Sequence, residues 1–293
     1  MIWFWRYGML LRRKGWFSWA SVYGTAFHDT MEQMYATQGK RWAPAPLKIP
    51  VGIALTKEKL AEQKYWEGVL KVQTEAYAER WKDDFELFEI KRIEVEVDII
   101  FEGIRLRGKI DLTFCTKDGK LWILDHKTTS RLDLKTVAGW DFRFQFMFYL
   151  WLAMKAMPDV TFAGYYINAI KKPTIQVRQK DTLEMFFARL QMNMSMEPDE
   201  YFYRDRLLLT KSSISHFEDF VLRPKLNRIK LLTNRETPDM IKETLVMNPN
   251  TNRCQLYGVC EFLPLCQHGY SREGFQYEQR PTKHEELGGE GGE

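Results

Sequence analysis

Residues 104–129 read IRLRGKIDLTFCTKDGKLWILDHKTT and carry the pattern of two strands joined by a tight turn. The first part alternates apolar and polar side chains, which is typical of a strand with one buried face. Asp118-Gly119 is a signature of a two-residue hairpin turn. The second part is an apolar run that ends in Asp125-His126-Lys127. We therefore expect Asp111 and Asp125 to lie on neighbouring strands.

The flanking sequence predicts a mixed α/β protein. Alternation continues upstream over residues 93–99, which indicates another half-buried strand. Apolar spacing and turn residues predict helices in 1–42, at 56–81, at 137–155 and over most of 181–246, and strands at 161–169 and 174–178. The expected fold class is α/β: a small mixed sheet flanked by helices, with helical additions and a C-terminal Cys loop.

Composition excludes several classes of protein. The chain has 293 residues, of which 45% are hydrophobic and 28% charged, so it can bury a core. Its net charge of +4 permits a nucleic-acid partner without requiring one. The longest apolar run, 146–154, is far shorter than the about 20 residues of a membrane-spanning helix. With four Cys and no secretory signal, we expect a cytoplasmic protein without a membrane partner.

The two aspartates and the lysine form a candidate catalytic site. Asp125 and Lys127 are two apart on a strand, so both point to one face, and Asp111 is expected beside them. Carboxylate oxygens suit Mg²⁺ or Mn²⁺, and Lys127 would orient water or stabilise developing charge. The alternative is an exposed Asp125–Lys127 ion pair worth under ~1 kcal/mol. The apolar run before Asp125 favours the functional interpretation, because a buried charge needs a partner or a role.

These residues resemble those of a known family. Gly108-Lys109-Ile110-Asp111, followed by Ile123-Leu124-Asp125-His126-Lys127-Thr128-Thr129, is similar to the PD-(D/E)XK nuclease superfamily, and within it to the RecB-like exonuclease branch with its CRISPR-associated and phage members. The resemblance implies a restriction-endonuclease-like core and a metal-dependent DNA exonuclease of phage or bacterial recombination, repair or replication. It implies that Asp111, Asp125 and the backbone carbonyl of His126 bind Mg²⁺ or Mn²⁺. It gives Lys127 a catalytic role.

An early helix carries Gly24-x-x-x-His28, which matches a motif of that branch. The resemblance implies that His28 is a further metal ligand. The alternative is a histidine on a helix face without a ligand role. Glu32 follows one turn later, and we expect it to be solvated.

The helix after the Asp-His-Lys strand carries Gln145-x-x-x-Tyr149. A spacing of four places both side chains on one helical face. The resemblance implies that Gln145 and Tyr149 contact DNA or support the active site. The alternative is that Tyr149 is a core residue, since its neighbours are apolar.

Three cysteines, Cys254, Cys260 and Cys266, cluster near the C-terminus. The resemblance implies a [4Fe–4S] cluster held by three C-terminal Cys and one N-terminal Cys. No N-terminal Cys is present here, so we expect either a native start upstream of Met1 or a lost fourth ligand. A zinc site that includes His268, or free thiols, are the alternatives.

The expected organisation is one nuclease domain over 1–270, with a helical part at 1–90, a sheet core at 91–180, a helical part at 181–246 and a Cys loop at 247–270. Residues 271–293 are expected to be disordered. The implied partners are DNA with free ends or single-stranded DNA, and a recombination or replication protein. The rival functions are a non-catalytic DNA-binding or assembly subunit with the same fold, and a structure-specific or RNA endonuclease.

Overall fold

The computed structural model describes residues 11–14, 17–50, 53–132, 144–233, 261–268 and 274–279. The chain groups into two compact units. The larger unit comprises 18–50 and 54–226, and the smaller comprises 1–17, 51–53 and 227–293.

The larger unit is a sheet with helices on both faces. In chain order its elements are α1 (Trp19–Ala36), α2 (Lys57–Arg80), α3 (Asp84–Leu87), β2 (Phe88–Phe101), β3 (Ile104–Thr116), β4 (Leu121–Thr129), α5 (Phe144–Ala156), β5 (Phe162–Lys171), α6 (Leu183–Met196), the short 3₁₀ turn η2 (Pro198–Glu200), β6 (Phe202–Leu208), α7 (Lys211–His216), the π-helical η3 (Phe217–Leu222) and the start of α8 (Arg223–Thr233).

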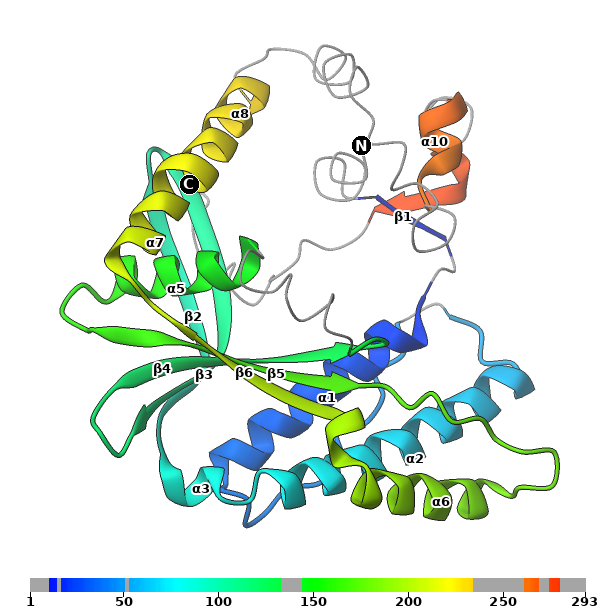
Figure 1. Cartoon of the computed structure of the whole chain (residues 1–293). Coiled ribbons are helices and arrows are strands. Elements are labelled where there is room, and N and C mark those ends of the chain that lie inside the picture. The colour runs from blue at the N-terminus through cyan, green and yellow to red at the C-terminus, as the bar shows by residue number, and fades with distance from the viewer. Residues whose placement is uncertain are drawn as a thin grey trace. The chain divides into compact units, whose positions relative to one another are not determined.

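The described strands of this unit form a five-stranded mixed sheet in the order β2-β3-β4-β5-β6. Only β4 and β5 are parallel, and the other neighbouring pairs are antiparallel. Helix α5 lies on one side of the sheet, and α1, α2 and α6 lie on the other (Figure 1). This architecture confirms the α/β fold class and is consistent with a restriction-endonuclease-like core.

Turn chemistry explains why β2, β3 and β4 follow one another directly. Glu102 and Gly103 both have positive φ and close the β2–β3 hairpin. Gly119, with φ 78°, closes the β3–β4 hairpin, where the Asp118 carboxylate accepts a hydrogen bond from the Lys120 amide. Glycine adopts a positive φ without steric strain. The turn expected at Asp118-Gly119 is confirmed.

The sequence predictions for the rest of the larger unit were partly correct. Helix α2 begins where Thr56 caps the amide of Lys59, as the 56–81 prediction requires. Residues 174–178, expected to be a strand, have no regular structure. The fifth strand is instead β6, inside the segment we expected to be mostly helical.

The smaller unit contains β1 (Leu11–Arg13), the rest of α8, α10 (Leu263–His268), the 3₁₀ turn η5 (Gly274–Gln276) and β7 (Tyr277–Gln279). Strand β7 pairs antiparallel with β1 and lies in the tail that we expected to be disordered. The aromatic rings of Phe262 and Tyr277 stack, and the Tyr277 hydroxyl donates to the Glu261 carbonyl. Among the described helices, none combines the length and apolar character needed to cross a bilayer.

Candidate active site

The candidate site lies where the pairing of β3 and β4 ends. The last paired residues there are Leu112 and Leu124, so Asp111 and Asp125 are the next residues to face each other. Beyond this point the amide of His126 donates to Asp111 Oδ2 at 2.9 Å. A side chain thus replaces the next backbone partner, and the two strands separate around the carboxylates.

Helix α1 brings His28 to Asp111. A Cβ at Gly24 would lie 3.2 Å from Thr128 Oγ1 of β4, so the absence of a side chain lets the helix lie close to that strand. One turn later, His28 Nδ1 is 3.1 Å from Asp111 Oδ2. The structure therefore places the Gly-x-x-x-His motif against the Asp-His-Lys strand.

This contact changes the pKa values of both groups. Burial lowers the pKa of His28, but the charge of Asp111, the hydrogen bond with Asp111 and the charge of Asp125 together outweigh burial, so the net pKa is raised. Burial also raises the pKa of Asp111, yet His28 and His126 hold it well below its usual value. Asp111 is therefore an ionised carboxylate, stabilised by the charge of His28 and by hydrogen bonds with both histidines.

Asp125 and Lys127 form a second pair on the side of β4 that faces α5. Lys127 Nζ is 2.6 Å from Asp125 Oδ2 and 5.9 Å from the ring centre of Phe146 in α5. Asp125 is only 1% exposed, and its Oδ1 accepts no hydrogen bond from the described residues. Burial raises the pKa of Asp125, and the positive charge of Lys127 only partly opposes this effect. Burial lowers the pKa of Lys127, but the charges of Asp125 and Asp111 outweigh burial, so the net pKa of Lys127 is raised.

Gln145 and Tyr149 lie on α5, as expected, and reach the same neighbourhood. Gln145 is exposed and Tyr149 is half-buried. Burial raises the pKa of the Tyr149 phenol, opposed by a hydrogen bond with Gln145 and reinforced by the charges of Asp125 and Asp111. Tyr149 therefore lies close enough to Asp125 and Asp111 for their charges to act on its phenol.

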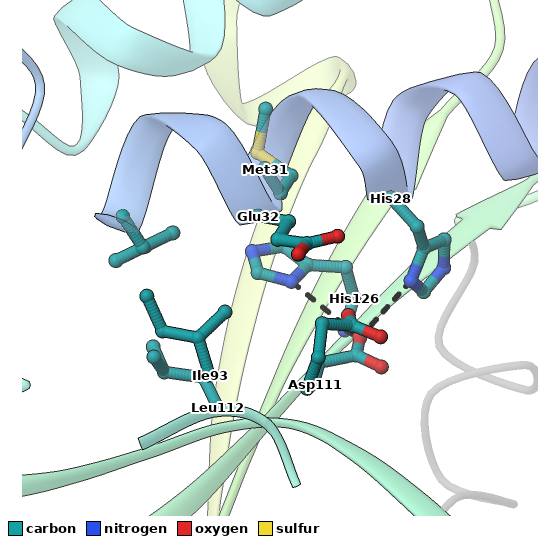
Figure 2. A pocket seen from close by; sticks show the side chains of 9 residues that line it. His28, Met31, Glu32, Ile93, Asp111, Leu112 and His126 are labelled. Atoms are coloured by element: carbon teal, nitrogen blue, oxygen red, sulfur yellow. Dashed lines mark hydrogen bonds and ion pairs between the residues drawn. The ribbon is translucent and has the colours of Figure 1, made fainter. Parts of the chain in front are cut away.

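A pocket on the α1 side is lined by His28, Glu32, Glu94, Asp111 and His126, together with apolar side chains. Figure 2 shows Glu32 with its carboxylate directed into this pocket, above Asp111 and between the two histidines. We expected Glu32 to be solvated; although exposed, it lines the pocket.

Glu94 is a residue of the pocket that no motif in the sequence indicates. It lies on β2 between Ile93 and Val95, which pair with the residues on either side of Asp111, so it faces Asp111. Its φ of 51° is unusual for a residue that is not glycine, and its carboxylate is 2.6 Å from Lys109 Nζ. Burial raises its pKa, and the nearby Asp111 and Glu32 contribute. Alternation alone had placed Glu94 among ordinary polar strand residues.

The donor set fits a hard divalent cation. Asp111 and Asp125 offer carboxylate oxygens, His28 offers an imidazole nitrogen, and the buried Asp125 Oδ1 is an acceptor without a donor. In the described part of the chain, no three such side chains already form a metal-binding group. His28 pairs with Asp111 and Lys127 with Asp125, so the carboxylate charges are balanced within the chain.

The cysteine prediction is not tested by the geometry. Cys254 and Cys260 lie outside the described residues, and for Cys266 only the backbone, in α10, is described. The iron–sulfur and zinc interpretations both stay predictions.

Comparison with known proteins gives an independent assignment. A search of curated proteins found no match to this chain. The family model described as the PD-(D/E)XK nuclease superfamily matches residues 1–267. That range includes the paired aspartates, Lys127 and the five-stranded sheet around them. Nucleases of this family cleave DNA with Mg²⁺ or Mn²⁺, and the chain belongs to the PD-(D/E)XK nuclease superfamily.

Proposed function

We propose that this chain is a metal-dependent DNA exonuclease of the RecB-like branch. The observation that carries the proposal is the meeting of His28, Asp111, Asp125 and Lys127 where β3 and β4 separate. The order of the motifs along the chain supports the branch. Its setting would be recombination, repair or replication in the cytoplasm of a bacterial or phage-infected cell.

Each residue has a distinct role in this proposal. Asp111, Asp125, His28 and the His126 carbonyl would hold Mg²⁺ or Mn²⁺, which stabilises charge on the phosphate oxygens when bound. Lys127 is held by Asp125 with its ammonium group in the site, where it orients the attacking water. Gln145 and Tyr149, on α5 beside the site, would contact the DNA strand.

End-labelled linear DNA, single- and double-stranded, and covalently closed circular DNA would test the proposal. Each substrate is incubated with Mg²⁺, Mn²⁺ or EDTA, using the parent and the variant Asp125→Asn. The matched control is Asp199→Asn, because that side chain is 84% exposed and pairs only with Arg80 among the interactions described for it.

We expect linear DNA to be degraded from its ends and closed circles to stay intact. Cleavage should stop with EDTA and fall by roughly 10³-fold in Asp125→Asn. Nicking of closed circles at the same rate would instead establish an endonuclease. DNA binding without cleavage by any metal would establish a non-catalytic subunit.

A further inference from the structure

A buried chain of polar side chains lies behind His126, on the side of the sheet covered by α1 and α2. It runs from Asp84 in α3 through Arg204 in β6 and Asn168 in β5 to Tyr77 in α2 and His126 in β4. Tyr77, His126 and Asn168 are each no more than 2% exposed. Water is excluded from these groups, so their donors and acceptors must match one another.

In the first part of this hydrogen-bonded chain, from Asp84 to Tyr77, the donors and acceptors can be assigned in only one way. Arg204 can only donate, and its guanidinium binds Asp84 through two bonds of 2.6 Å and Asn168 Oδ1 through a third of 2.5 Å. The Asn168 amide oxygen is therefore the acceptor. Its nitrogen then donates to the Tyr77 hydroxyl at 2.6 Å.

A second hydroxyl in the cluster has its proton committed elsewhere. Tyr35 donates to Asp84 Oδ2 at 2.6 Å, and its oxygen is 2.9 Å from that of Tyr77. The single proton of Tyr77 therefore has two candidate acceptors, the Tyr35 oxygen and His126 Nε2, the latter at 3.0 Å.

The other nitrogen of the ring decides between them. His126 Nδ1 is 3.6 Å from Asp111 Oδ2, too far for a strong hydrogen bond but close enough for the carboxylate to favour a proton on Nδ1. Nε2 then carries a lone pair that faces the Tyr77 hydroxyl. Figure 2 shows the His126 and Asp111 side chains in this relation at the floor of the pocket.

We propose that Tyr77 is a positioning residue: its hydroxyl donates to His126 Nε2 and holds the ring as the Nδ1–H tautomer directed at Asp111. Fixing this ring also fixes the main chain of His126, whose amide binds Asp111. The effect of the Tyr77–His126 hydrogen bond on catalysis rests on the proposed nuclease function, whereas the tautomer of His126 does not.

The structure offers a matched pair of variants. Tyr77→Phe keeps the ring, which contacts His126 with centroids 5.7 Å apart, and removes only the hydroxyl. Tyr35→Phe removes a hydroxyl that is equally buried and also next to Tyr77 but that has no bond to His126. It also removes the competing acceptor, so the Tyr77 bond to His126 should be retained.

Nitrogen-15 chemical shifts of the imidazoles, with His126 assigned by its loss in His126→Gln, report the tautomer without any activity assay. We expect Nδ1–H in the parent and in Tyr35→Phe, and a shift towards Nε2–H in Tyr77→Phe. The Mn²⁺ concentration for half-maximal cleavage should rise roughly tenfold in Tyr77→Phe and stay near the parent value in Tyr35→Phe.

An Nε2–H tautomer in the parent would overturn the proposal, and so would unchanged His126 shifts in Tyr77→Phe. Equal losses of activity in both variants, with the tautomer unchanged, would show a structural role only. If the parent cleaves no DNA, the nuclease proposal fails, while the tautomer assignment is still decided by the spectrum.

Discussion

Asp111 and Asp125 face each other across two strands, yet their surroundings are opposite. Asp111 Oδ2 accepts from the His126 amide and lies beside His28, whereas Asp125 Oδ1 has no donor among the described residues. Accordingly, the pKa of Asp111 is held low and that of Asp125 is raised by burial. The Asp111 carboxylate therefore stabilises the fold, whereas burial of the Asp125 carboxylate costs free energy of folding.

This asymmetry predicts different effects of removing each charge. In EDTA, Asp111→Asn should lower the free energy of unfolding by about 1–3 kcal/mol, because hydrogen bonds to a charged acceptor are lost. Asp125→Asn should lower it by less, because relief of a buried carboxylate offsets part of the loss that follows when Lys127 is left without its partner. Urea denaturation of both proteins at neutral pH tests this, and a larger loss in Asp125→Asn would contradict it.

Lys127→Met should reduce DNA cleavage by about 10²–10³-fold, because it removes the ammonium that we propose orients the attacking water. Its methylenes are retained, so packing on Phe146 should persist. The control is Lys120→Met, where the side chain is 61% exposed and pairs with Asp118 in the hairpin turn. Single-turnover cleavage rates decide the question, and equal rates for parent and Lys127→Met would exclude a catalytic lysine.

Gly108→Ala should disturb the contact of β3 with α5. The added Cβ would lie 2.7 Å from Leu152 Cδ2 and 3.2 Å from Tyr149 Cε1, so α5 must move. We expect a loss of about 1–3 kcal/mol and slower cleavage. If Leu152→Ala is added, the double variant should lose less free energy of unfolding than the two single variants lose together, as a double-mutant cycle would measure. Simple additivity would show that the clash is not the cause.

Glu218 makes a pH-dependent contribution to stability. Burial raises its pKa, but bonds from Trp151, Lys155 and Arg223 outweigh burial and lower it to about 2. Because the folded-state pKa of Glu218 lies below the unfolded-state pKa, the stabilisation is complete above about pH 4.5. It is lost as the pH falls towards about 2.

Glu218→Gln should therefore cost about 2 kcal/mol at pH 7, and its difference from the parent should shrink as the pH falls below 4. Glu79→Gln, at a side chain 76% exposed, should show no such difference. Chemical denaturation from pH 7 to pH 3 measures both. A pH-independent effect of Glu218→Gln would contradict the assignment.

The sequence predicted those parts of the fold that local pattern determines. Strands β2 to β4 follow from alternation and from the turn at Gly119, and α2 from its apolar spacing. Strand β6 was missed because it holds Arg204, Asp205 and Arg206 in place of an alternating pattern, and it lies at the edge of the sheet.

The site was predictable only as far as its residues form motifs. His28, Asp111, Asp125 and Lys127 stand in recognisable spacings, and the structure brings them together. Glu94 and the residues behind His126 meet only through tertiary packing, so no spacing reveals them. Asn168 was the one available signal, since an amide within an apolar strand requires partners.

The parallel pairing of β4 with β5 has a consequence for the chirality of the site. A chain that leaves one strand and returns parallel beside it must cross over the sheet, and such crossovers are right-handed in almost every protein because L-amino acids give strands a right-handed twist. Helix α5 lies in that crossover. The side on which Tyr149 stands relative to Lys127 is therefore determined by the handedness of the polypeptide, before any side chain of α5 makes a contact.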